Sequence, residues 1–268
     1  MSVSEPPSDG AVVTARKPIA YDVSDDIARI IFDDPENRNA VTAAFAHEFA
    51  RVTELATTDS SVRVILLGAR GSTFSVGGDI REFLADEARI GDHLRLLTDL
   101  IHAGVRHLVG APVPVVVALN GMAAGGGFSM ALTGDLVIAK RSAKLNSGYT
   151  RSALTPDAGL TWLLPRMVGH ARAFEIIALN ETLSAEHARE LGIVNRVVDD
   201  DAFDDEIERL VRRLAEMPLG LLGAVKRLLH DGGGNNLATH LDAEADAIVG
   251  RVETPETRDV LSSFIRKP

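Results

Sequence analysis

The sequence contains no cysteine, and this absence excludes disulfide bonds, thiolate nucleophiles and cysteine-ligated zinc or iron–sulfur centres. It also lacks any apolar run approaching the about 18 residues of a transmembrane helix. The first residues are polar, include two prolines and have no apolar core of the kind found in a secretory signal. We therefore expect a soluble, cytoplasmic protein that does not associate with membranes.

Positive charge is scarce. The chain has 28 Lys and Arg residues against 38 Asp and Glu residues, a formal net charge of −10. Without a long basic run, such a chain is expected to bind neither nucleic acids nor anionic membrane surfaces. A few local donors can still hold an anionic small ligand. The eight histidines show no metal-ligand spacing, so we predict no metal site.

The 268 residues are enough for one large domain or two modest ones. Buried β-strand patterns at 62–67 and 112–120 alternate with helical patterns, and the chain is mostly helical from about residue 157. This order predicts an α/β core followed by a helical region. We divide the chain into a flexible arm (1–17), a core (18–200) and a helical C-terminal region (201–268).

Two glycine-rich loops, Thr73–Ile80 and Asn120–Met130, each follow a predicted strand and precede a predicted helix. Glycines at such junctions let the backbone approach a ligand and direct its N–H groups outward. Two N–H groups that face one point form an oxyanion hole. The alternative is that the glycines only form tight turns and close packing. Neither loop matches a P-loop or a dinucleotide-binding fingerprint, so nucleotide binding is not predicted.

Two polar residues allow competing interpretations. Ser129 lies in a stretch close to the G-x-S-x-G element of serine hydrolases, yet it follows Asn120 by nine residues and is expected inside a helix, where a serine is usually inert. Asp157 follows a proline and precedes an amphipathic helix, so local sequence favours an N-cap. A catalytic carboxylate is the other interpretation of Asp157.

Five segments, in order along the chain, carry a resemblance to a known family: Glu36–Thr42, Thr73–Phe83, Pro112–Leu132, Leu154–Ile176 and Leu183–Val198. Together they resemble the crotonase family, the enoyl-CoA hydratase/isomerase superfamily. The resemblance implies an α/β fold built as a spiral of ββα units, with a helical C-terminal region that forms trimers. It also implies an acyl-CoA thioester as substrate, with the N–H groups of Gly78 and Gly126 as the oxyanion hole.

The chain departs from the hydratases of that family at two positions. Ser129 and Tyr149 stand where hydratases carry the glutamates that activate water, so the standard hydration mechanism is not expected. Asp157 instead resembles the aspartate of family isomerases, including the phenylacetate-pathway epoxide/oxepin isomerases, and the nucleophile of 4-chlorobenzoyl-CoA dehalogenase. We predict an acyl-CoA isomerase with Asp157 as the acid/base.

No separate cofactor is predicted, because coenzyme A is part of the substrate. Arg38 lies in the turn that, by the resemblance, binds the pantetheine and nucleotide parts of CoA in members of the family. Its guanidinium could pair with a phosphate of CoA. A homotrimer or hexamer is expected. The alternatives are a hydratase with non-standard residues, a non-catalytic acyl-CoA-binding protein and a serine hydrolase. The residues expected around the substrate are Arg38, Val76, Asp79, Ile80, Ser129 and Tyr149.

Overall fold

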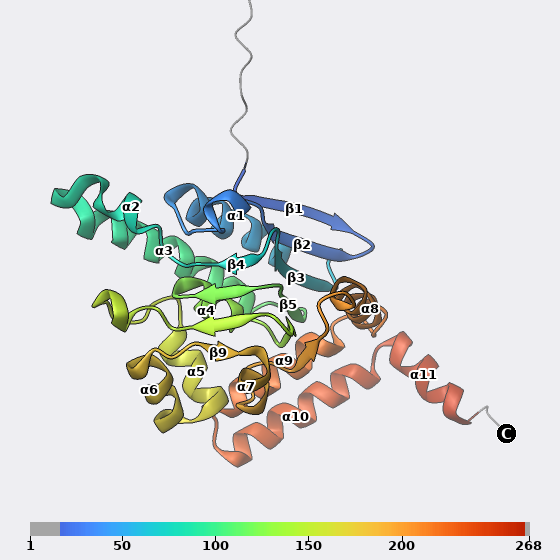
Figure 1. Ribbon diagram of the computed structural model, residues 1–268. Coiled ribbons are helices and arrows are strands. Elements are labelled where there is room, and N and C mark those ends of the chain that lie inside the picture. The colour runs from blue at the N-terminus through green and yellow to red at the C-terminus, as the bar shows by residue number, and fades with distance from the viewer. Residues whose placement is uncertain (1–16, 266–268) are drawn as a thin grey trace, which may run out of the picture.

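A computed structural model of the protein describes residues 17–265 (Figure 1). The predicted N-terminal arm, except for its last residue Lys17, lies outside the described residues. Lys17 forms an ion pair of 3.4 Å with Glu48. No helix within residues 17–265 has the length and apolar character needed to cross a membrane.

The core contains two β-sheets, and from β3 to β8 successive strands belong alternately to one sheet and the other. In the large sheet the first pair of strands is antiparallel and all the others are parallel; its order is β1 (Ile19–Ser24), β2 (Ile27–Phe32), β3 (Val64–Ala69), β5 (Val115–Leu119), β7 (Leu136–Lys140) and β10 (Arg196–Val198). The small sheet has the order β4 (Thr73–Ser75), β6 (Met122–Ala124), β8 (Lys144–Asn146) and β9 (Leu183–Ser184).

The connection between the sheets repeats three times. From β3 to β4, from β5 to β6 and from β7 to β8, the chain passes from the large sheet into the small one. Strands β4, β6 and β8 pair in parallel, so each turn of chain stacks on the one before. The predicted spiral of ββα units is confirmed. The short strands of the small sheet were not predicted, because three residues beside glycine carry no periodic pattern.

Helices cover the sheets and form the C-terminal region (Figure 1). Thr42 caps the first α-helix, with Thr42 Oγ1 accepting a hydrogen bond of 3.2 Å from the Phe45 N–H. The α-helices are α1 (Ala43–Thr58), α2 (Ile80–Phe83), α3 (Ile90–Val109), α4 (Gly126–Ala131), α5 (Leu160–Val168), α6 (His170–Leu179), α7 (Ala185–Glu190), α8 (Phe203–Ala215), α9 (Leu221–Gly232), α10 (Leu237–Val252) and α11 (Pro255–Ile265). Short 3-10 helices occupy Pro35–Asn37, Leu84–Arg89 and Thr150–Ser152.

Four phenylalanines form an aromatic cluster in the main core. Phe32 packs edge-on against Phe45 with ring centroids 4.8 Å apart, and Phe74 lies 5.1 Å from Phe32 on centroids. Phe49 stacks on Phe45 from one helical turn further along α1. All four side chains are fully buried, and burial of each contributes about 2–3 kcal/mol of transfer free energy. This cluster fixes α1 and the strand that precedes the first glycine-rich loop.

The C-terminal helices fall into two groups. Helix α8 packs on the large sheet through Phe203, Ile207 and Val211, so it covers core strands although it lies inside the predicted region 201–268. Helices α10 and α11 contain no buried residue. Their exposed apolar side chains are Leu237, Leu241, Ile248, Val249, Val252, Val260, Leu261, Phe264 and Ile265.

Candidate active site

The two glycine-rich loops touch each other where β4 and β6 end. These strands are neighbours in parallel, so the loops that follow them emerge at the same edge of the small sheet. Gly77 has φ +81°, and a Cβ atom there would lie 2.8 Å from the carbonyl oxygen of Ala124 and 2.9 Å from the nitrogen of Gly126. Only glycine permits this backbone approach. Strand pairing and glycine together bring the predicted donors into one place.

Both predicted oxyanion glycines, Gly78 and Gly126, line a cavity of about 520 Å³. Within the described chain, their N–H groups donate to no protein acceptor. A backbone N–H that faces an open cavity without a partner is available to a ligand oxygen. The cavity wall is otherwise largely apolar, with Val41, Phe83, Leu97, Ile101, Met130 and Leu154 among its members.

Asp157 lies in the same cavity, and the structure contradicts the N-cap interpretation. Helix α5 starts at Leu160, its N-cap is Gly159 with φ +82°, and no side chain caps it. The Asp157 carboxylate instead uses Oδ1 twice: it contacts Nε2 of His102 and accepts a 2.5 Å hydrogen bond from the N–H of Ala158. Among the described residues Oδ2 has no partner, so one carboxylate oxygen is free toward the cavity.

His102 is the site residue that the sequence did not predict. It lies on α3, 55 positions before Asp157, and its spacing to His93 and His107 matches no ligand pattern. Its position next to Ile101, on the apolar face of the amphipathic helix α3, is the sequence signal that it could face inward. The side chains of His102 and Asp157 are 41% and 31% exposed, so the pair can be reached from the cavity.

Ser129 and Tyr149 hold the backbone of Asp157. Ser129 is fully buried, and its Oγ donates a 2.9 Å hydrogen bond to the carbonyl oxygen of Asp157. Tyr149 Oη donates to the same oxygen at 3.3 Å and lies 3.1 Å from Ser129 Oγ. Burial raises the pKa of Tyr149 to about 12, so its phenol stays protonated near neutral pH. No histidine among the described residues hydrogen-bonds Ser129, which gives no support to a serine hydrolase.

The remaining predicted binding residues divide by position. Val76 and Ile80 line the cavity. Asp79 does not: its carboxylate caps α2, and its hydrogen bonds with Arg81 lower its pKa to about 2. Arg38 is exposed in a turn with φ +52°, and its carbonyl accepts a hydrogen bond of 3.3 Å from the N–H of Val76. Arg38 therefore lies beside the first glycine-rich loop, outside the cavity wall.

Comparisons with known proteins agree with this architecture. A family model described as enoyl-CoA hydratase/isomerase matches residues 22–267. The 1,2-epoxyphenylacetyl-CoA isomerase of Escherichia coli K12 is 35% identical over 244 residues, covering 90% of this chain and 92% of the relative. The 4-chlorobenzoyl coenzyme A dehalogenase-2 of an Arthrobacter species is 32% identical over 93% of this chain and 91% of the relative. A Thermobifida fusca protein solved in complex with CoA superimposes with a TM-score of 0.81 at 30% identity. The match covers 88% of this chain and 93% of that protein.

Proposed function

The chain belongs to the enoyl-CoA hydratase/isomerase family, and from this premise we propose that it is an acyl-CoA isomerase that uses Asp157 as its acid/base. The observation that carries the proposal is one shared cavity. It contains the unpaired N–H groups of Gly78 and Gly126 together with a free carboxylate oxygen of Asp157. Among the described residues that line this cavity, Asp157 is the one acidic side chain.

The chemistry begins at the thioester carbonyl. Its oxygen accepts hydrogen bonds from the N–H groups of Gly78 and Gly126, which stabilise the enolate by about 3 kcal/mol for each donor. Asp157 Oδ2 removes a proton from the α- or γ-carbon and returns it to a different carbon of the same acyl group. The double bond moves, and no atom is gained or lost.

His102 and the neighbouring hydroxyls position this carboxylate. His102 Nε2 and the Ala158 N–H both contact Oδ1, while Ser129 and Tyr149 fix the Asp157 carbonyl. Because every one of these contacts avoids Oδ2, that oxygen keeps its lone pairs for the substrate. Hydration would ordinarily need a second group to activate water, and no second carboxylate lines the described part of the cavity.

Proton exchange tests the proposal directly. The protein is incubated in D2O with a panel of CoA thioesters, and NMR follows deuterium at the α- and γ-carbons. Isomerase chemistry places deuterium at both carbons of one substrate. Addition of water across the double bond without γ-exchange would support the hydratase alternative, and tight binding without exchange for every thioester would support a non-catalytic acyl-CoA-binding protein.

A second candidate is hydrolytic dehalogenation of an aryl-CoA. It is favoured by the contact between Asp157 and His102 and by the relative named as a 4-chlorobenzoyl coenzyme A dehalogenase. In this scheme Asp157 attacks the ring carbon and chloride leaves with its bonding electrons. Water, deprotonated by His102, then hydrolyses the aryl ester and regenerates the carboxylate. Chloride release from 4-chlorobenzoyl-CoA, read with a chloride electrode, separates this reaction from isomerisation.

A further inference from the structure

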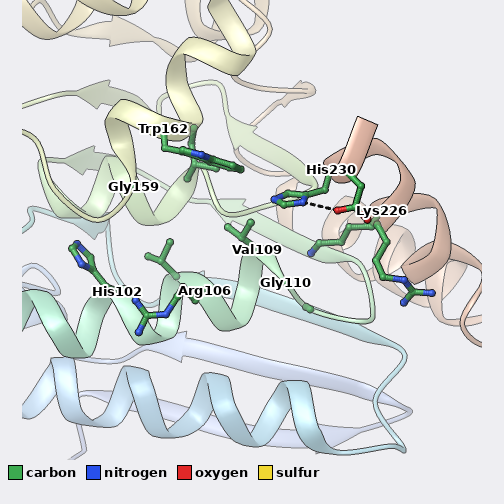
Figure 2. A pocket seen from close by; sticks show the side chains of 13 residues that line it. His102, Arg106, Val109, Gly110, Gly159, Trp162, Lys226 and His230 are labelled. Carbon is green, nitrogen blue, oxygen red and sulfur yellow. Dashed lines mark hydrogen bonds and ion pairs between the residues drawn. The ribbon is translucent and has the colours of Figure 1, made fainter. Parts of the chain in front are cut away.

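A second cavity of about 590 Å³ lies beyond His102, between α3, α5 and α9 (Figure 2). Neither the predicted oxyanion glycines nor Asp157 line it. The residues that do are His102, Val105, Arg106, Val109, Gly110, Ala111, Gly159, Trp162, Leu163, Lys226, Arg227, His230 and Asp231.

The two cavities are consecutive along one face of α3. Leu94, Leu97 and Ile101 line the first cavity, and Val105 and Val109 line the second. These positions are three or four residues apart, so they form one stripe on the helix. His102 lines both cavities, and so does the segment that follows Asp157, with Ala158 facing the first and Gly159 the second. His102 and the Ala158–Gly159 segment therefore lie at the boundary of the two spaces.

The lining of the second cavity is largely apolar, although it includes charged side chains. Lys226 Nζ donates to the carbonyl oxygen of Leu108 and to Asp135, each at 2.8 Å. His230 pairs with Asp231 at 3.2 Å. Figure 2 shows the guanidinium of Arg106 pointing away from Trp162. The apolar part of the wall comes from Val105, Val109, Ala111, Trp162 and Leu163.

We propose that this second cavity receives the distal part of a long, apolar acyl chain whose thioester end lies in the first cavity. The inference rests on the proposed function, since it takes the Asp157 cavity as the reaction site. Along α3, His102 and Val109 are about 10 Å apart at 1.5 Å per residue. A zigzag of bonds of about 1.5 Å needs roughly eight carbon atoms to cover that distance. Acyl groups of about twelve carbons therefore fill both cavities.

A helix from a second copy of the chain is the competing occupant. The boundary shared at His102 favours an acyl chain instead, because it makes the second cavity a continuation of the space around Asp157. An extended alkyl chain there makes dispersion contacts with Val105, Val109 and Leu163.

Trp162 makes the proposal testable, because it is the only tryptophan in the sequence and lines the second cavity. Its fluorescence is titrated with butanoyl-CoA and with dodecanoyl-CoA held below its micelle-forming concentration. Both ligands are expected to bind, but only dodecanoyl-CoA should shift the Trp162 emission. The proposal would be overturned if the Trp162 emission changed with protein concentration and not with the length of the acyl chain. Light scattering on the same samples would then show association, which would mean that a second copy of the chain fills the cavity.

A filled cavity provides the second test. Val109→Phe should weaken dodecanoyl-CoA binding at least tenfold and leave butanoyl-CoA binding unchanged, which also shows that the variant is folded. Val225→Phe is the matched control, since Val225 is exposed on α9 and does not line the cavity. Equal loss for both chain lengths, or no loss for either, contradicts the proposal. Deuterium exchange into the CoA thioesters is measured separately from Trp162 fluorescence. A change in Trp162 emission without deuterium exchange rejects the isomerase activity but not the acyl-chain site. Deuterium exchange without a change in Trp162 emission rejects the acyl-chain site but not the isomerase activity.

Discussion

At the scale of single residues, Asp157 connects most of the site. Its carboxylate contacts His102 and the Ala158 N–H, and its carbonyl accepts from Ser129 and Tyr149. With the Leu160 N–H, which also donates to that carbonyl at 3.2 Å, five groups hold the side chain and main chain of this one residue. Such fixation is what a proton-transfer group needs to stay within reach of a substrate carbon.

Asp157→Asn should lower the rate of α- and γ-proton exchange by a factor of roughly 100 or more, because the amide cannot accept the proton. Binding of the CoA thioester should change little, since the N–H donors of Gly78 and Gly126 remain. Deuterium exchange by NMR measures the rate and calorimetry the affinity. Ser129→Ala is the comparison and should lose less activity, since Tyr149 and the Leu160 N–H still hold the Asp157 carbonyl; a fully active Asp157→Asn protein would refute the mechanism.

Tyr149 gives a pH-dependent prediction. Its pKa is raised, above all by burial, from 10.0 to about 12, so folding favours the neutral phenol. The associated stabilisation is present below pH 10 and is lost as the pH rises toward 12. Denaturation between pH 8 and 11 should therefore show wild-type stability falling above pH 10. Tyr149→Phe should start about 1 kcal/mol lower and decline less steeply above pH 10, the rest of the decline coming in part from Tyr21, whose pKa is also raised by burial; parallel curves for the two proteins would contradict the assignment.

Arg38→Ala tests the predicted contact with the CoA phosphates. Loss of a charge-assisted contact should weaken binding and reduce its salt dependence, both measured by titration with a CoA thioester at several salt concentrations. Arg213→Ala on α8 is the control, because Arg213 is also exposed and lies far along the chain from the glycine-rich loops. If both variants keep wild-type affinity, Arg38 is not part of the site.

At the scale of elements, α3 joins the core to the site. Gly104 faces α1 so closely that a Cβ atom there would lie 2.5 Å from Cδ1 of Phe49. The adjacent stripe of the same helix, from Leu94 to Val109, lines both cavities, and His102 lies beside it. Packing between α1 and α3 therefore sets the distance from His102 to Asp157.

Gly104→Ala should destabilise the protein by about 1–3 kcal/mol through overpacking against Phe49, despite the higher helix propensity of alanine. Gly91→Ala, near the start of α3, is the matched control because nothing lies within 4 Å of its Cβ position. That substitution should be neutral or stabilise by up to about 1 kcal/mol. Urea denaturation gives the change in the free energy of unfolding for both variants. Equal changes would mean that the close contact of Gly104 with Phe49 leaves no cost for an added methyl group.

The elements also show what sequence could and could not supply. Strands with buried β-branched runs and the Thr42 cap were predictable, since each leaves a local pattern. The pairing of β4 with β6, which brings Gly77 against Gly126, depends on contacts between residues 47 or more positions apart. The His102–Asp157 contact is equally non-local, and the capping role of Asp157 failed because a left-handed Gly159 starts the helix later.

At the scale of the whole molecule, the C-terminal helices leave apolar surface uncovered. Neither α10 nor α11 buries a residue, and Phe264 and Ile265 are 73% and 87% exposed. Figure 1 shows α11 projecting beyond the core. Apolar surface of this extent is typical of a subunit interface.

We predict a trimer or hexamer in solution, measured by light scattering. Leu261→Glu combined with Phe264→Glu should shift the population toward smaller species, because burying two carboxylates in an interface is costly. The change should leave the Thr42-capped core folded, as circular dichroism can check. A monodisperse wild-type monomer at micromolar concentration contradicts the prediction.

The backbone origin of the two N–H donors has an evolutionary consequence. The N–H groups of Gly78 and Gly126 are main-chain atoms whose positions are set by strand pairing, so substitution of a surrounding side chain removes neither; only proline at position 78 or 126 itself would do so. Selection can then exchange the polar groups around them without first dismantling the means of stabilising an enolate. Ser129 and Tyr149, whose hydroxyls hold the Asp157 carbonyl, are groups of this exchangeable kind. On the proposed function, a lineage built on this scaffold can change its reaction by small steps while each intermediate still activates a thioester.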